Sequence, residues 1–175
     1  SVAEKVLNIG ADWVNDVSGG RYDPEIFNVI ADKGSHYVLT HSRGNSKTMD
    51  SLAKYNDVVK DVKNELANQI DLAISKGLKK EQIIIDPGIG FAKNVSQNLT
   101  LLRNLEEFTL MPYPLLIGAS RKRFIGSVIN ESEPSKRIFG NAAIASRCVI
   151  AGVDILRVHD VKEISQVILM TKSII

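Results

Sequence analysis

One unit recurs five times along this chain of 175 residues: a short apolar run, a polar loop that often contains glycine, and a helical pattern. The apolar runs span residues 11–16, 36–41, 83–86, 115–118 and 154–159. Strand–helix–strand units of this kind form parallel sheets with right-handed crossovers. Because the runs are almost continuously apolar, we expect both faces of the strands to be buried. The repeat therefore predicts an α/β fold in which helices cover a parallel sheet.

Two architectures contain such a series of units: an open doubly wound sheet and a (β/α)8 (TIM) barrel. A doubly wound dinucleotide-binding domain carries GxGxxG after a strand, and this chain has no such motif. A barrel places its chemistry at the carboxyl ends of the strands and in the loops that follow them. We therefore expect about five units of a (β/α)8 barrel, with a site at the polar strand ends.

Local signals set the expected limits of the helices. Asp23 and Pro24 suit the N-cap and first position of one helix, and Gly34 suits its C-terminus. Asp160 and Glu163 have capping-box spacing ahead of the last helix. The longest helix is predicted from apolar residues at helical spacing, namely Tyr55, Val58, Val59, Val62, Leu66, Ile70 and Ala73.

Composition restricts the functions open to this chain. The net charge is only +2, from 22 basic and 20 acidic residues, which argues against a broad nucleic-acid surface. No apolar run is long enough to span a bilayer, so we expect no membrane partner. The length suits a single domain over residues 1–175. Cys148 lies in an apolar helical stretch and is expected to be buried rather than nucleophilic.

Polar residues cluster where the predicted strands end. The residues that end or follow the five runs are Asn15, Asp16, His41, Arg43, Asp86, Ser120, Arg121, Lys122, Arg123, Arg157 and His159. A single polar strand end is ordinary, but in a barrel all of these ends meet at one mouth. Their convergence predicts a binding or catalytic site.

Asn15 and Asp86 are suited to bind the edge of a heterocycle. A buried asparagine offers a donor and an acceptor and needs partners for both. A carboxylate that ends an Ile-Ile-Ile run loses hydration and needs fixed donors, which a guanidine-like edge would supply. The structural alternatives are an Asn15 that ties a loop to the barrel, and an Asp86 that caps a helix or binds its loop through Gly88 and Gly90.

Two groups of cations indicate anion sites. Residues 120–123 precede an expected helix N-terminus, where the helix itself favours anions. Arg157 and His159 alternate with apolar residues, so a period of two sends both to one side, as a phosphate or pyrophosphate site requires. The alternatives are a solvated cationic face and a histidine with a structural partner. Phe91 either stacks on a flat ring or fills its loop, and we interpret His41 as structural.

Four segments together resemble dihydropteroate synthase: NDVSGG at residues 15–20, DPGIGFAK at 86–93, GASRKRFIG at 118–126 and RVHDVKE at 157–163. They cover essentially the whole chain in the family's order and are closer to the fungal type, in which this unit ends a multifunctional polypeptide. The resemblance implies a pterin-binding (β/α)8 barrel that condenses 6-hydroxymethyl-7,8-dihydropterin pyrophosphate with 4-aminobenzoate, giving 7,8-dihydropteroate and pyrophosphate in folate biosynthesis. It also implies a Mg²⁺ cofactor, a homodimer, and an intracellular location, cytoplasmic or mitochondrial.

By motif, the resemblance implies roles for individual residues. Asn15 and Asp86 correspond to ligands of the pterin edge, and Lys122 corresponds to the lysine beside the pterin ring. Arg157 and His159 correspond to the pyrophosphate ligands. The residues expected to be catalytic are therefore Asp86, Lys122, Arg157 and His159.

The resemblance assigns fewer residues to the aminobenzoate pocket than to the pterin and pyrophosphate sites. Phe91, Ser120 and Arg121 lie in the motifs that form this pocket in the family. Arg123 stands where bacterial relatives often have the serine that helps to hold the aminobenzoate carboxylate, so the carboxylate partner stays open. Strand two ends in Thr40-His41, where the family usually has Met-His.

The family's N-terminal motifs, which supply the Mg²⁺ ligand and half of the active-site loops, do not occur in these 175 residues. We therefore expect the C-terminal part of a barrel, inactive alone and without a metal ligand of its own. Two other interpretations remain. One is a pterin-binding methyltransferase-type barrel, which needs no pyrophosphate site, and the other is a catalytically silent pterin-binding remnant.

Overall fold

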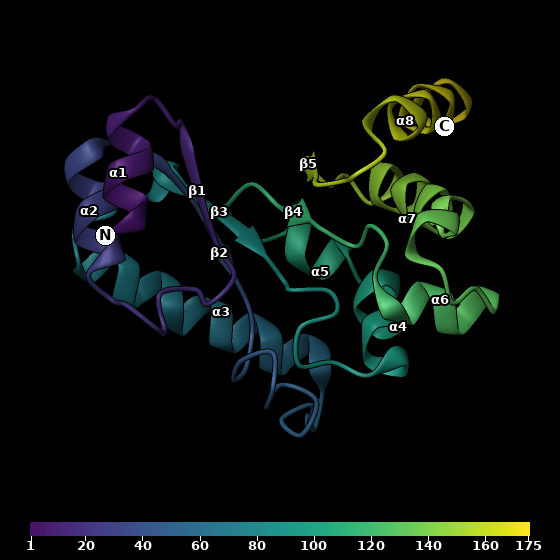
Figure 1. Cartoon of the computed structure of the whole chain (residues 1–175), viewed down its shortest axis with the longest axis horizontal. Helices are drawn as coiled ribbons and strands as arrows, with labels where there is room; N and C mark the ends of the chain where they lie inside the picture. The colour runs from purple at the N-terminus through teal and green to yellow at the C-terminus, as the bar shows by residue number, and fades with distance from the viewer.

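The computed structural model describes residues 1–175 and contains all five predicted strands (Figure 1). The strands are β1 (Trp13–Asp16), β2 (His36–Thr40), β3 (Ile83–Asp86), β4 (Leu116–Ile117) and β5 (Ile155–Leu156). The helices are α1 (Val2–Asn8), α2 (Ile26–Lys33), α3 (Val58–Ser75), α4 (Val95–Arg103), α5 (Glu106–Thr109), α6 (Arg123–Ile129), α7 (Ile138–Ile150) and α8 (Val161–Ile174). Two short 3₁₀ turns, η1 (Lys80–Gln82) and η2 (Pro134–Lys136), complete the set. No helix is both long and apolar enough to cross a membrane.

The strands are parallel and follow one another in chain order. β1, β2 and β3 form one sheet and β4 and β5 a second, and an isolated parallel bridge between Ile85 and Leu115 connects them. A doubly wound sheet would reverse its strand order at a switch point, whereas a barrel runs in sequence. The consecutive order therefore favours the barrel-type arrangement.

The strand array is curved. In a flat sheet, the first and fifth strands would lie about 19 Å apart, at about 4.8 Å for each neighbour. Arg157, which follows β5, nevertheless donates a hydrogen bond to Asn15 of β1. Only an arc brings the ends of these two strands within reach of one another.

Alternation along the strands separates two apolar layers. Outward-facing residues pack with the helices in the main core, including Tyr37, Leu39, Ile83, Ile85, Leu115 and Ile117. The intervening residues Val38, Ile84 and Leu116 form a smaller cluster with Ile155. This second cluster lies on the inner face of the arc. Two residues further along the chain, the same inner face presents the polar strand ends.

The prediction that both faces of every strand are buried is confirmed for the central strands only. Every residue of β3 and both residues of β4 are buried. β1 lies at an edge, and Trp13 and Asn15 are exposed on its inner side. The expectation of a buried Asn15 is therefore wrong for this chain, because β1 carries no neighbour on its open side.

The long helix begins later than the apolar pattern suggests. Its N-cap is Asp57, whose carboxylate accepts hydrogen bonds from the backbone N–H groups of Val59 and Lys60. Tyr55 therefore lies before the helix, where the Arg43 guanidinium stacks on its ring at 3.9 Å. The predicted apolar face is otherwise confirmed: Val58, Val62, Leu66, Ile70 and Ala73 are buried.

One predicted N-cap and one predicted capping box are wrong. α2 begins at Ile26, because Asp23 forms a turn in which its side chain accepts from the Glu25 N–H at 3.2 Å. Gly34 ends that helix in the left-handed conformation, as predicted. Asp160 is the N-cap of α8 by position, but its side chain makes no capping hydrogen bond. That carboxylate binds Arg121 instead, with an oxygen 2.6 Å from the guanidinium.

Candidate functional site

The inner face at the carboxyl ends of the strands holds a three-residue cluster of Asn15, Asp86 and Arg157. Arg157 donates through Nη1 to Asn15 Oδ1 and through Nη2 to Asp86 Oδ2, the latter at 3.3 Å. These residues come from the ends of β1, β3 and β5, so the predicted convergence of strand ends is confirmed for them. Asn15 also lies 3.4 Å from Thr40 Oγ1, at the end of β2.

Asp86 is a buried carboxylate with fixed donors around it. Only 1% of the residue is exposed, and its Oδ1 accepts from the Gly88 N–H at 2.8 Å. Burial raises the pKa of Asp86, while the charge of Arg157 and the Gly88 hydrogen bond oppose the rise. The loop contact that we considered as a structural alternative is therefore present, and Oδ2 is left to bind a guanidinium.

Arg157 occupies a space that a glycine leaves open. A Cβ at Gly118, at the end of β4, would collide with the Arg157 guanidinium. β5 ends at Leu156, so Arg157 and His159 lie in the loop after the strand and not on it. His159 is bound to Ser120, with its Nδ1 2.9 Å from Ser120 Oγ. The predicted Arg157–His159 pair thus shares one side but has two different partners.

Lys122 lies at the centre of the strand ends as the N-cap residue of α6. Its Nζ donates to the Ile89 carbonyl oxygen and lies 4.3 Å from the centre of the Phe91 ring. Burial lowers the pKa of Lys122 to about 8, against the opposing charge of Asp86. Phe91 is therefore a ring against which the Lys122 amine packs.

The other cations of the segment 120–123 separate. Arg121 pairs with Asp160 at 2.6 Å, and Arg123 reaches Asp50 at 3.1 Å while staying largely exposed. Residues 120–123 therefore form neither a uniformly solvated cationic face nor one anion site, the two interpretations that the sequence left open. Only Ser120 and Lys122 face the inner side beside Arg157.

Two cavities meet at Lys122. The smaller, of about 170 Å³, is lined by Ser120, Lys122, Arg157 and His159 among others. The larger, of about 600 Å³, is strongly cationic, with Lys93, Arg121, Lys122, Arg123 and Arg137 in its wall and Asp50 as its one acidic residue. Lys122 thus lies between a compact space suited to an anion and a wider space suited to a second anionic molecule.

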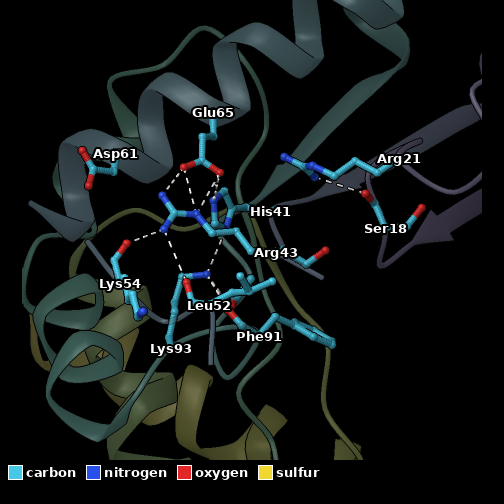
Figure 2. A network of polar contacts seen from close by, with 12 residues as sticks. Ser18, Arg21, His41, Arg43, Leu52, Lys54, Asp61, Glu65, Phe91 and Lys93 are labelled. Carbon is cyan, nitrogen blue, oxygen red and sulfur yellow. Dashed lines mark hydrogen bonds and ion pairs between the residues drawn. The ribbon is translucent and has the colours of Figure 1, made fainter. Parts of the chain in front are cut away.

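A buried polar network beside these cavities was missed from the sequence (Figure 2). His41 is fully buried between Glu65, 3.1 Å from Nε2, and Lys93, 2.9 Å from Nδ1. Arg43 forms an ion pair with the same Glu65. We had interpreted His41 as structural without naming a partner, and we gave Lys93 and Glu65 no role. The available signal was a glutamate next to the buried positions Val62 and Leu66 of an amphipathic helix.

The charges of this network are set by burial and by hydrogen bonds. Burial lowers the pKa of His41 to about 4, and the Lys93 charge acts in the same direction. Burial lowers the pKa of Lys93 to about 7. Burial acts to raise the pKa of Glu65, but hydrogen bonds from His41 and Arg43 outweigh it and lower this pKa to about 2. The imidazole is therefore neutral and lies between a carboxylate and an amine.

Metal ligands are a separate question. No group of three or more His, Cys, Asp or Glu side chains is arranged to hold a metal ion. No residue described above is therefore assigned as a Mg²⁺ ligand.

The chain matches a known family over most of its length. Residues 1–159 match the family described as "Pterin binding enzyme". The dihydropteroate synthase of Synechocystis sp. is 45% identical over 95% of this chain, and the folic acid synthesis protein fol1 of Pneumocystis carinii is 39% identical over 99% of it. The chain spans 57% of the first relative and 24% of the second. These identities do not favour the fungal protein over the bacterial one.

Solved structures agree with the sequence relatives. A dihydropteroate synthase from Thermus thermophilus, solved in complex with 6HMPPP, superposes with a TM-score of 0.93 at 38% identity, covering 98% of this chain and 68% of that one. The same enzyme in complex with 4-aminobenzoate gives 0.94 at 37% identity, covering 99% and 67%. With the strand order and the site geometry, these similarities show that the chain belongs to the family of pterin-binding enzymes.

Proposed function

We propose that this chain forms part of a dihydropteroate synthase, an alkyl-group transferase that joins 6-hydroxymethyl-7,8-dihydropterin pyrophosphate to 4-aminobenzoate. The observation that carries the proposal is the binding of the Arg157 guanidinium by Asn15 and Asp86. Acceptors that hold a guanidinium in this way are matched to the guanidine-like edge of a pterin. Relatives bound to 6HMPPP and to 4-aminobenzoate support the same substrates.

The proposal includes the place of this chain in the barrel. We infer that its five strands are the C-terminal β/α units of a (β/α)8 barrel, forming one pterin-binding domain over residues 1–175. Support comes from the consecutive strand order, the curvature, and the 57% of the Synechocystis relative that the chain spans. The missing strands would cover the open edge of β1, where Asn15 is exposed.

The reaction breaks one C–O bond and forms one C–N bond. The pterin methylene carbon loses pyrophosphate, the amine of 4-aminobenzoate attacks that carbon, and the amine nitrogen then releases a proton. Asp86 and Asn15 hold the pterin edge, and Lys122 lies beside the ring between the two cavities. Arg157 and His159 stabilise the negative charge that develops on the leaving pyrophosphate.

The aminobenzoate is proposed to enter the larger cavity, with its ring near Phe91 and Arg121 and its carboxylate among the cations there. Arg123 and Arg137 both line this space. Arg137 already donates to the carbonyl oxygens of Glu131, Ser132 and Arg121, whereas Arg123 makes only an exposed pair with Asp50. Arg123 is therefore our candidate for the carboxylate partner that the sequence left open.

Arg157 cannot hold the pterin acceptors and the pyrophosphate at once, so we expect the two ligands to respond in opposite directions to its removal. Arg157→Ala should weaken binding of inorganic pyrophosphate roughly 10- to 100-fold, because charge-assisted hydrogen bonds are lost. Affinity for a pterin without pyrophosphate should stay the same or rise, because no guanidinium competes for Asp86. Arg157→Lys should recover only part of the pyrophosphate affinity, since a forked donor is lost.

Calorimetry on a complete barrel that carries this chain measures both affinities of the Arg157 variants. His159→Ala serves as the milder comparison, because His159 is exposed and already engaged with Ser120. Unchanged pyrophosphate affinity together with a lower melting temperature would mean that Arg157 is only a structural partner of Asp86.

Turnover is the direct test of the proposed function. The complete barrel should release pyrophosphate when given both substrates and should form 7,8-dihydropteroate. Pterin binding without turnover would indicate a catalytically silent remnant. Pterin binding without any affinity for pyrophosphate would favour a methyltransferase-type barrel.

Three further parts of the proposal rest on the family resemblance alone. They are a Mg²⁺ cofactor, a homodimer of the complete enzyme, and an intracellular location, cytoplasmic or mitochondrial. No residue of this chain is assigned as a Mg²⁺ ligand, and the roles given above to Asp86, Lys122, Arg157 and His159 involve no metal.

A further inference from the structure

Lys93 has a full set of acceptors inside the protein. Its Nζ lies 2.9 Å from His41 Nδ1, 3.0 Å from the Gly88 carbonyl oxygen and 2.9 Å from the Phe91 carbonyl oxygen (Figure 2). An ammonium group has three N–H donors and no acceptor, so three acceptors match it completely. Only 7% of Lys93 is exposed, and water therefore has little access to replace any of them.

The other members of the network fix the direction of these hydrogen bonds. Glu65 is ionised and can only accept, so the Nε2 nitrogen of His41 must carry the proton that binds it. Nδ1 is then a bare acceptor that faces Lys93. His41 thus connects the Lys93 amine to the negative Glu65, and Arg43 forms an ion pair with the same Glu65.

The loop held by Lys93 is the loop that contacts Lys122. Gly88 and Phe91 give their carbonyl oxygens to Lys93, and between them Ile89 gives its carbonyl oxygen to Lys122. The Phe91 ring lies under the Lys122 amine. Lys93 therefore holds the backbone of the loop, and Lys122 contacts the same loop from the side of the site.

We propose that Lys93, oriented by His41 and Glu65, is a positioning residue that fixes the loop 88–91 and thereby places Phe91 for the aminobenzoate. The reference to aminobenzoate rests on the proposed function, whereas the fixing of the loop does not. Lys93 makes no hydrogen bond to Asn15 or Asp86 and reaches Asp86 only through Gly88, whose N–H binds Asp86 Oδ1, so its loss should affect the two substrates unequally.

Two variants test the proposal in the complete barrel. Lys93→Met keeps an unbranched side chain that is one atom shorter and removes all three donors, and Glu65→Gln keeps its shape and removes the charge that orients His41. Gln82→Leu is the matched control, because Gln82 is also buried and donates at 2.9 Å to a loop carbonyl, that of Ser35, but at the opposite end of β3. It should lower stability without changing the site.

Hydrogen exchange measures the loop without any substrate. In Lys93→Met, the amides of Gly90 and Phe91 should exchange about tenfold faster, while the amides of β3 keep their protection. Glu65→Gln should give a smaller change in the same direction. Unchanged exchange at Gly90 and Phe91 in both variants would overturn the proposal, whatever the protein catalyses.

Steady-state kinetics measure the consequence for the site. Lys93→Met should raise KM for 4-aminobenzoate about tenfold, while pterin affinity should stay within about twofold of the unsubstituted protein. If Lys93→Met weakens the binding of both substrates equally, or of neither, Lys93 has only a structural role. The control Gln82→Leu is expected to change the binding of neither substrate. A further outcome is that the complete barrel binds no aminobenzoate while Lys93→Met still speeds amide exchange at Gly90 and Phe91. That result would support the role of Lys93 in fixing the loop and would reject the proposed function.

Discussion

Replacing Lys122 with alanine is expected to lower kcat roughly 10²- to 10³-fold, which is the usual loss when a preorganised charge is removed from an active site. Lys122 lines both cavities, and its only hydrogen bond is to the Ile89 carbonyl. Its removal takes away the one cation that lines both cavities. Because the folded protein loses only this contact and the packing on Phe91, the melting temperature should change by a few degrees at most.

The rate and the melting temperature must be measured on the same preparation of the complete barrel. Lys63→Ala is a suitable control, since Lys63 pairs with Glu107 at 2.7 Å on the outer surface and touches neither cavity. The control should keep normal turnover. A large loss of stability in Lys122→Ala, with near-normal activity in the folded fraction, would show that Lys122 supports the fold rather than the reaction.

The strand ends could be predicted because periodicity and burial decide them locally. A period of two places Asn15, Asp86 and Arg157 on one face, and the apolar runs locate each strand, although β5 ends at Leu156, before Arg157. The chain order of the strands and the barrel then bring these faces together. The contact between Asn15 and Arg157, which are 142 residues apart, follows from the curvature of the whole array and not from either segment.

The buried network could not be predicted because its members identify one another only in three dimensions. Glu65 lies 24 residues from His41, and Lys93 lies 52 residues from it. Along the sequence, a glutamate on an amphipathic helix is ordinarily a solvated residue. The packing of α3 against β2 turns it into the partner of a buried histidine.

The capping box predicted for the last helix fails because of a tertiary contact. The spacing of Asp160 and Glu163 favours a capping box, but the ion pair with Arg121 competes for the same carboxylate. Arg121 is 39 residues away, so local spacing contains no sign of this competitor. Tertiary partners therefore override local signals where charges gather, as they do around the site.

Asp86→Asn should weaken pterin binding much more than binding of 4-aminobenzoate. The carboxylate uses Oδ1 for the Gly88 N–H, and its Oδ2 accepts from the Arg157 guanidinium, which a guanidine-like edge would replace. An asparagine in the same position keeps one oxygen and turns an N–H toward the second donor, so a buried donor on each side is left unmatched. The expected loss is roughly 2–4 kcal/mol, or about 30- to 900-fold in Kd.

A second carboxylate that accepts from a backbone N–H, exposed and at the opposite end of the strands, separates this effect from general destabilisation. Asp154 precedes β5 and accepts from the Leu115 N–H at 2.8 Å, just as Asp86 accepts from Gly88 at 2.8 Å. Asp154→Asn should therefore lower stability and leave pterin affinity unchanged. Titration calorimetry with a pterin that lacks pyrophosphate, on both variants of the complete barrel, makes the comparison. Equal affinities for the two variants would remove Asp86 from the binding site, and with it the main support for pterin as the substrate, because Asn15 alone has one acceptor where the guanidine-like edge needs two.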